Sequence, residues 1–213
     1  MKHWVFDLDG TLVDSGFAYE KAVELIFAHF HLPCSKLDLQ KAHLYFNPYE
    51  FFGLYLQNPA DVQKAINLLL QFNMEHVPDI PTFAGIPEFI NELAKQNVAI
   101  SVWTGRDFNS ARKILDHTGL GRNISRCVSR TCVTNTKPMP DGLLKILNES
   151  NHASDSVVMI GDHKFDVHGA RAARVKPVSV SWKATDPQLL AEISDHHFNH
   201  VGDLHAWTLN HYR

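Results

Sequence analysis

Residues 4–15 read WVFDLDGTLVDS, an apolar run that ends in two aspartates two positions apart. In a β-strand, positions i and i+2 point to the same face, so Asp7 and Asp9 can address one site. Gly10 and Thr11 permit a tight turn whose backbone amides can meet an anion. Together these residues suit a carboxylate nucleophile, an acid/base and an oxygen-binding metal. A polar strand end or a helix start is the plain alternative.

The bulk properties describe an ordinary folded protein. The chain has 213 residues, of which 45% are apolar and 20% charged, with a formal net charge of -3. No basic excess indicates nucleic acid, and no run approaches the roughly 18 apolar residues of a membrane span. Asp7 and Asp9 interrupt any N-terminal secretory signal. The three cysteines lack paired CxxC spacing and indicate reduced thiols, so we expect a cytoplasmic protein.

From about Val98 onward, short apolar runs alternate with amphipathic segments, which is typical of βαβ units and a parallel sheet. We expect strands at 3–7, 98–103, 156–160 and 177–181. The expected helices are 86–95, 108–118, 140–149, 166–174 and 187–194. The fold class is therefore α/β, with a doubly wound, Rossmann-like parallel sheet.

Residues 16–78 break this alternation, because their apolar residues recur at helical spacing. Asn58 followed by Pro59 predicts the start of one helix. We expect a small all-helical cap at 16–78, inserted after the first strand, and an α/β core formed by residues 1–15 and 79–213. A cap that follows the aspartates directly could close over them and exclude water.

Ligands of open parallel sheets bind beyond the carboxyl ends of the strands, where residues far apart in sequence converge. Four places in this chain are candidates: Asp7 with Asp9, Thr104 with Gly105, Lys137, and Asp162 with Asp166. The Thr104 hydroxyl and the amides after it could hold phosphoryl oxygens, and the Lys137 ammonium could neutralise them. Taken singly, these residues could instead be helix caps or solvated surface charges.

In this order the four places resemble the four motifs of the haloacid dehalogenase superfamily, and the helical insert resembles its C1-type cap. The first motif is DLDGTL at 7–12, and the last is GDHKFD at 161–166. The segments KPMPD at 137–141 and GDHKFD at 161–166 are most similar to the corresponding motifs of the phosphoglycolate phosphatase-like branch. His163 stands where that branch often has a small hydroxyl residue.

The resemblance implies a phosphatase that hydrolyses a small phosphorylated metabolite through an aspartyl-phosphate intermediate, with Mg2+ as cofactor. Asp7 would attack the phosphorus, and Asp9 would protonate the leaving oxygen and later activate water. The resemblance also implies three supporting groups: phosphate binding by Thr104, Gly105 and Lys137, metal binding by Asp7, the Asp9 backbone carbonyl and Asp162, and support of Asp162 or Lys137 by Asp166.

Other functions stay open. A sugar phosphomutase of the same superfamily could use the same nucleophile, and a non-catalytic accessory or binding protein could keep the fold. A dehalogenase or a phosphonatase is disfavoured because Asp9 is present. The partner is expected to be a small phosphorylated metabolite, with neither nucleic acid nor membrane, and the protein a monomer or a homodimer.

Three features of the sequence bear on specificity. The insert at 16–78 contains no arginine, although a small dianionic substrate is well served by bidentate arginine. It offers lysines instead, with Arg106 available from the core. Six aromatic residues between Tyr45 and Tyr55 could line a pocket, pack the core of the insert or form a homodimer contact. The cluster of His196, His197 and His200 could bind a transition metal, or it could be a set of surface histidines.

Overall fold

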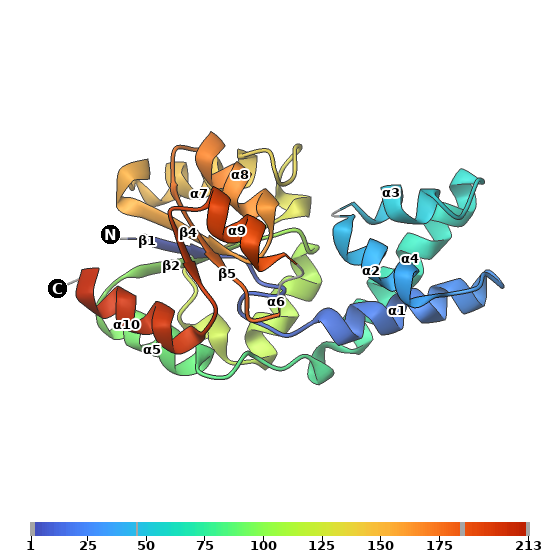
Figure 1. Ribbon diagram of the computed structural model, residues 1–213, viewed down its shortest axis with the longest axis horizontal. Helices are drawn as coiled ribbons and strands as arrows, with labels where there is room; N and C mark the ends of the chain where they lie inside the picture. The colour runs from blue at the N-terminus through green and yellow to red at the C-terminus, as the bar shows by residue number, and fades with distance from the viewer. Residues whose placement is uncertain (1–2, 46, 184–185, 212–213) are drawn as a thin grey trace. The chain divides into compact units, whose positions relative to one another are not determined.

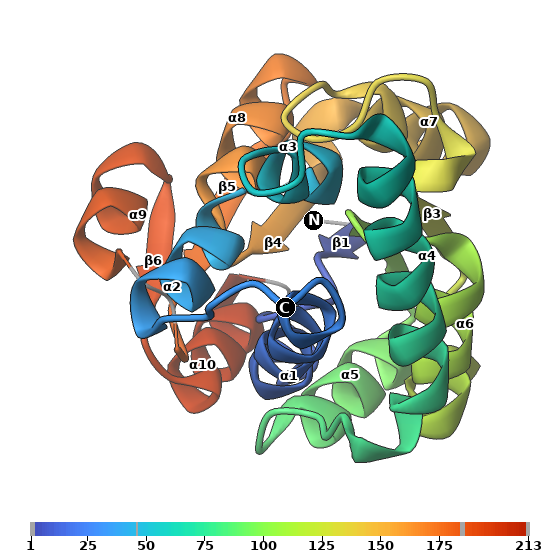
Figure 2. The same cartoon turned by 90° about the vertical axis from the view of Figure 1, so that its right-hand side faces the viewer.

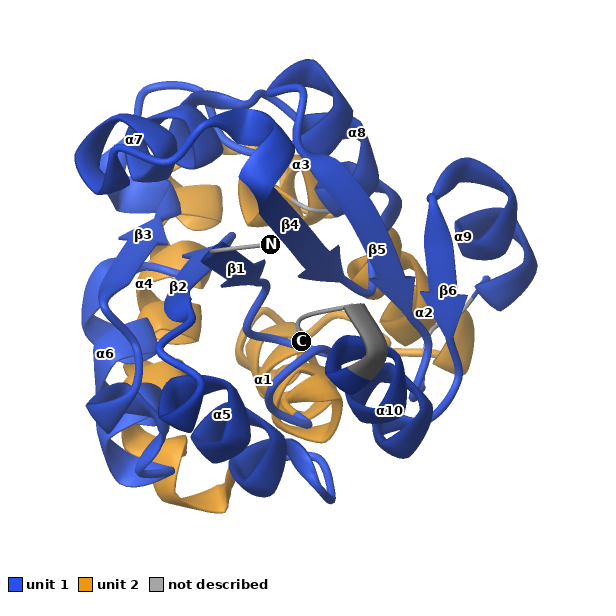
Figure 3. Cartoon of the chain, turned by 90° about the vertical axis from the view of Figure 1, so that its left-hand side faces the viewer, with its two compact units in different colours: residues 1–14, 81–213 blue, residues 15–80 orange. Residues whose placement is uncertain are grey.

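The computed structural model describes residues 3–45, 47–183 and 186–211. By its internal contacts the chain divides into two compact units, coloured separately in Figure 3. Unit 1 comprises residues 1–14 and 81–213, and unit 2 comprises residues 15–80. Within unit 1, the backbone amide of Asp14 donates to the carbonyl of Pro81 at 2.9 Å. The two chain segments that lead into and out of unit 2 are therefore tied together.

Unit 1 contains a six-stranded parallel sheet in the order β3-β2-β1-β4-β5-β6 (Figure 3), and β1, β2, β4 and β5 are also marked in Figure 1. Its strands are β1 (His3–Phe6), β2 (Ala99–Thr104), β3 (Arg126–Ser129), β4 (Val157–Gly161), β5 (Lys176–Val180) and β6 (His196–Phe198). All five pairings are parallel, since each connection crosses back over the sheet. The predicted doubly wound α/β class is confirmed, and the sheet has two more strands, β3 and β6, than the sequence led us to expect.

The helices of unit 1 are α5 (Ile86–Lys95), α6 (Phe108–His117), α7 (Asp141–Ser150), α8 (Lys164–Ala172), α9 (Pro187–Ile193) and α10 (Val201–His211). Short 3-10 turns occur at Leu120–Arg122, Arg130–Cys132 and Ser154–Ser156. Helix α10 was not predicted. Helix α8 begins two residues before the expected position, because His163 caps its first turn.

The two faces of the sheet bury different side chains, because neighbouring residues of a strand point in opposite directions. On one face, Val5 and Trp103 lie in the cluster formed with α7 and α8. On the other face, Trp4 and Phe6 each lie 6.0 Å, centroid to centroid, from the ring of Phe89 in α5. Figure 3 shows α5, α6 and α10 on that second side of the sheet. The buried sheet therefore gives the carboxyl ends of its strands a rigid base.

Unit 2 is all helical in the residues described: α1 (Gly16–His29), α2 (Lys36–Leu44), α3 (Pro48–Gly53), α4 (Pro59–Glu75) and the 3-10 turn Val77–Asp79. Helix α4 packs against α1 and α3 (Figure 2). The side chain of Asn58 accepts a hydrogen bond from the amide of Ala60 at 3.0 Å, and Pro59 occupies the first turn. The predicted helix start is therefore confirmed.

The aromatic stretch between Tyr45 and Tyr55 packs the core of unit 2. Phe51 and Phe52 are fully buried, and the ring of Phe51 stacks on that of Phe27 at 6.0 Å. Tyr45 and Tyr55 pack against the same cluster. Tyr49 is partly exposed and bonds to Gln63, whereas Phe46 lies outside the described residues. Among the described residues, no helix is long and apolar enough to cross a membrane.

Candidate active site

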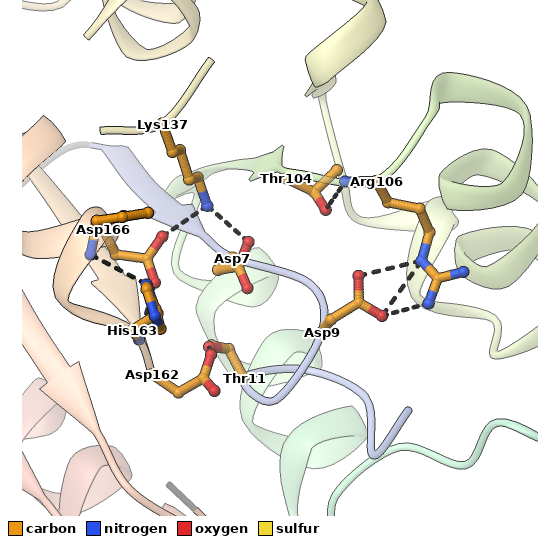
Figure 4. Close-up of polar contacts among 10 residues, drawn as sticks. Asp7, Asp9, Thr11, Thr104, Arg106, Lys137, Asp162, His163 and Asp166 are labelled. Carbon is orange, nitrogen blue, oxygen red and sulfur yellow. Dashed lines mark hydrogen bonds and ion pairs between the residues drawn. The ribbon is translucent and has the colours of Figure 1, made fainter. Parts of the chain in front are cut away.

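Strand register brings the candidate residues to one edge of the sheet. Phe6, the last residue of β1, pairs with Val102 on one side and with Ile160 on the other. Asp7 follows at the carboxyl end, and its amide donates to the Ile160 carbonyl at 2.8 Å. Thr104 is the last residue of β2 and is buried. Figure 4 shows the polar side chains that gather around Asp7 at this edge.

Lys137 joins two of the acids. Its Nζ donates to Oδ1 of Asp7 and to Oδ1 of Asp166, each at 2.6 Å. The lysine side chain is 1% exposed, and its ammonium lies 4.7 Å from the ring centroid of Trp103. A buried ammonium is stabilised by such paired carboxylates and by an aromatic face. The contact with Trp103 was not predicted, because the sequence around this residue indicates only an ordinary core aromatic.

Three carboxylates converge here. Asp7, Asp162 and Asp166 each offer an oxygen, and these oxygens all lie within 4.8 Å of one another. Burial, together with the nearby Asp166 and Asp9, raises the pKa of Asp7 to about 7 although Lys137 opposes the shift. Burial also raises the pKa of Asp162 well above its usual range, and Asp7 and Asp166 add to this. Buried acids that repel one another and present oxygen ligands fit a hard divalent cation.

This triad differs in part from the expected metal ligands, which were Asp7, the Asp9 backbone carbonyl and Asp162. Asp7 and Asp162 belong to both sets. The third carboxylate of the triad is Asp166, which was expected to support Asp162 or Lys137. Asp166 also has the supporting contacts: it binds Lys137 and accepts from the amide of His163 at 3.0 Å. His163 in turn accepts from the amide of Phe165 at 3.2 Å and thereby caps α8. Burial lowers the pKa of His163.

Two glycines make room for the acids. Gly10 has a φ of +79°, and a Cβ atom there would lie 2.1 Å from Oδ2 of Asp162. A Cβ atom on Gly161 would lie 2.3 Å from Cγ of Asp166. Thr11, which follows Gly10, donates from Oγ1 to Oδ1 of Asp162 at 2.9 Å. The turn after β1 therefore positions Asp162 directly, a role for Thr11 that the sequence did not reveal.

Asp9 pairs with Arg106, and both lie on the side of Asp7 that faces away from Asp162 (Figure 4). Its carboxylate accepts from Nε of Arg106 at 3.0 and 3.2 Å and from Nη2 at 2.5 Å. The hydroxyl of Thr104 accepts from the backbone amide of Arg106 at 3.1 Å. Thr104 therefore shapes the turn through Gly105 that carries this arginine. From the sequence, Arg106 was expected only to supply a positive charge from the core, and its pairing with Asp9 was not predicted.

The histidines near the C-terminus have structural partners. His197 bonds through Nδ1 to Ser179 at 2.7 Å and through Nε2 to Ser181 at 3.0 Å. The ring of His196 lies 4.8 Å from that of Trp207. In the ranges that the structure describes, the group able to hold a metal ion is the carboxylate triad, and it includes no histidine.

The site is a buried lysine paired with carboxylates at the carboxyl edge of a parallel sheet, the edge at which α/β proteins bind their ligands. Residues 4–180 match the family described as haloacid dehalogenase-like hydrolase. The chain belongs to this family and is a hydrolase of that kind, as the motifs at 7–12 and 161–166 predicted.

Several known proteins resemble the chain along most of its length. The pyrophosphatase PpaX of Listeria monocytogenes is 24% identical over 189 residues, which cover 88% of this chain and 87% of that protein. The structure of a predicted phosphoglycolate phosphatase from Haemophilus somnus superposes with a TM-score of 0.84 at 17% identity, covering 98% of each chain. A predicted phosphatase from Clostridium acetobutylicum gives a TM-score of 0.84 at 22% identity, covering 99% of each. These structural matches establish the fold.

Proposed function

We propose that the protein is a Mg2+-dependent phosphatase that hydrolyses a small phosphorylated metabolite through an aspartyl-phosphate intermediate. The observation that carries the proposal is the position of Lys137, whose ammonium lies 2.6 Å from an oxygen of Asp7 and is buried beside it. A fixed ammonium there would neutralise both the nucleophile and the phosphoryl oxygens that approach it. The phosphatase names of the relatives support the same reaction.

In the first step, an oxygen of Asp7 forms a bond to phosphorus while the bond from phosphorus to the leaving oxygen breaks. The leaving oxygen keeps that electron pair and takes a proton from Asp9. In the second step, a water molecule gives a proton to Asp9, and its oxygen attacks phosphorus. The bond between phosphorus and Asp7 then breaks, which restores the Asp7 carboxylate and releases phosphate.

The supporting residues would act by charge and position. Lys137 binds the phosphoryl oxygens, together with the Thr104 hydroxyl and the amide of Gly105. Asp7 and Asp162 would hold the Mg2+ ion, with the Asp9 carbonyl as a further ligand and Asp166 holding Lys137 in place. When bound, the ion would supply positive charge to the phosphoryl group and to the nucleophile.

We assign the role of the cap to the helical residues between the two chain segments of unit 1. The chain enters unit 2 after Asp14 and returns to unit 1 at Pro81. Unit 2 therefore follows, in sequence, the turn that carries Asp7 and Asp9. As a cap, unit 2 would select the substrate, a role that inserted loops and lids have in other enzymes.

The test is phosphate release from a panel of phosphorylated metabolites and pyrophosphate, measured with Mg2+ and with EDTA. We expect release that depends on Mg2+ and falls to the background rate in the Asp7→Asn variant. Asp155→Asn is the matched control, because Asp155 is exposed and precedes β4, far from the strand ends that carry the site. Normal release by Asp7→Asn would rule out the proposed nucleophile.

A further inference from the structure

A tryptophan that follows strand β5 holds the turn formed by residues 8–13. The indole Nε1 of Trp182 donates a hydrogen bond to the backbone carbonyl of Thr11 at 3.0 Å, across 171 positions of sequence. The carbonyls of Leu8 and Val13 in the same turn accept from backbone amides instead. Thr11 is 1% exposed, so its carbonyl is shielded from bulk water. Loss of the indole N–H would leave a buried carbonyl without its donor, which is costly, and the turn would have to move to find another.

Trp182 stands on a firm base. The amide of Ser181, the residue before it, donates to the carbonyl of Phe198 in β6 at 3.0 Å and so extends the pairing of β5 with β6. Directly after it, the ammonium of Lys183 binds Oδ2 of Asp14 at 2.5 Å. The segment is therefore tied to the sheet on one side and to the chain that follows the turn on the other.

The turn that Trp182 holds also positions Asp162. The hydroxyl of Thr11 donates to Oδ1 of Asp162 at 2.9 Å, and Figure 4 shows the two side chains together. Gly10 packs so closely against the same carboxylate that a Cβ atom there would lie 2.1 Å from Oδ2. A shift of the turn would therefore move this carboxylate or break its hydrogen bond. Asp162 needs such support, because oxygens of Asp7 and Asp166 lie within 4.8 Å and repel it.

We propose that Trp182 is a positioning residue for the metal site. It holds the carbonyl of Thr11, the hydroxyl of Thr11 holds Asp162, and Asp162 is thereby kept where it can bind the ion. Groups that orient a metal ligand from behind affect the affinity for the metal although they do not touch it. This inference rests on the proposed function in one respect, the Mg2+ ion that Asp162 would bind.

The test is calorimetric titration with Mg2+ alone, so that no substrate or turnover is needed. Trp182→Phe keeps an aromatic ring and removes the N–H, and the Kd for Mg2+ should rise about three- to tenfold, as expected for the loss of one neutral hydrogen bond. Thr11→Val removes the hydroxyl that binds Asp162 and should raise the Kd by about tenfold or more.

The double variant separates a path through Thr11 from a general loss of structure. If Trp182 acts through Thr11, the Trp182→Phe, Thr11→Val protein should bind Mg2+ about as weakly as Thr11→Val alone. Trp207→Phe is the matched control, because Trp207 is also half-buried but its ring lies against those of Trp4 and Phe198. Its Kd should equal that of wild type. Circular dichroism confirms that each variant is folded, and Trp182→Leu replaces the Phe variant if that protein does not fold.

A rise in Kd of less than about threefold in Trp182→Phe would overturn the proposal, and so would factors that multiply in the double variant. If wild type binds no Mg2+, the Mg2+ dependence of the proposed function fails by itself. Crystal structures of wild type and Trp182→Phe then decide the role of Trp182. A contact between Thr11 and Asp162 that lengthens in the variant from 2.9 Å to beyond about 3.5 Å supports positioning, and a contact that persists contradicts it.

Discussion

Replacing Lys137 by methionine should destabilise unit 1 strongly, although the two side chains are similar in length. The ammonium lies 2.6 Å from one oxygen of Asp7 and 2.6 Å from one of Asp166, whose side chains are only 11% and 3% exposed. Removing one partner of a buried ion pair costs about 3–5 kcal/mol, because the other partner stays buried without its counter-charge. Here two carboxylates lose their partner. Since Asp7 already has a pKa raised to about 7 and can take up a proton, we expect about 3 kcal/mol.

The assay is urea denaturation followed by circular dichroism, with EDTA present so that no divalent cation replaces the ammonium. Lys145→Met, which removes an exposed lysine of α7, is the control and should change the unfolding free energy little. Adding Asp166→Asn to Lys137→Met should recover part of the loss, because it removes one of the two unpaired charges. A loss below about 1 kcal/mol for Lys137→Met, or a further loss in the double variant, would refute this account of the buried charges.

Three other perturbations test different parts of the molecule. Gly10→Ala should cost about 1–3 kcal/mol by urea denaturation, because φ is +79° and the new Cβ would meet Asp162. Asn58→Ala should cost about 1 kcal/mol by thermal denaturation, since it removes the cap of α4. Burial, His152 and Arg126 lower the pKa of His3 from 6.5 to about 4, so the unfolded chain binds a proton between these values that the folded chain does not. Stability should therefore fall as the pH drops from 6.5 to 4, by up to about 3 kcal/mol, and less in His3→Gln.

These three predictions have their own controls. Gly53→Ala should be tolerated, because nothing lies within 4 Å of the added Cβ. Gln57→Ala changes an exposed residue next to Asn58 and should leave the melting temperature nearly unchanged. If wild type and His3→Gln lose stability in parallel below pH 6.5, His3 is not the group responsible.

The elements that the sequence predicted are those with a strong local pattern. The strands β1, β2, β4 and β5 are buried along almost their whole length and consist mostly of apolar residues, and the helix at Ile86–Lys95 has clear periodicity. β3 escaped prediction because only half of its four residues are buried. β6 has three partly exposed residues at the sheet edge, two of them histidines. Edge strands depend on the neighbouring strand more than on their own composition.

For the site, the sequence predicted which residues reach the edge of the sheet, because strand ends are fixed by topology. It could not predict how side chains pair once they are there. The hydrogen bond from Thr11 to Asp162 spans 151 positions, and the pair of Arg106 with Asp9 spans 97. Both depend on the path of two tight turns, which composition and periodicity do not determine.

In the proposed mechanism, Asp7 takes the phosphoryl group from the substrate. The most direct measurement uses acetyl phosphate, whose acetate leaves without needing a proton, and the Asp9→Asn variant, in which the second step should stall for lack of a base. After acid quenching, peptide mass spectrometry should find phosphate on Asp7, and the signal should vanish in the Asp7→Asn, Asp9→Asn double variant. The absence of a phosphorylated peptide, or the same signal without Asp7, would contradict the account.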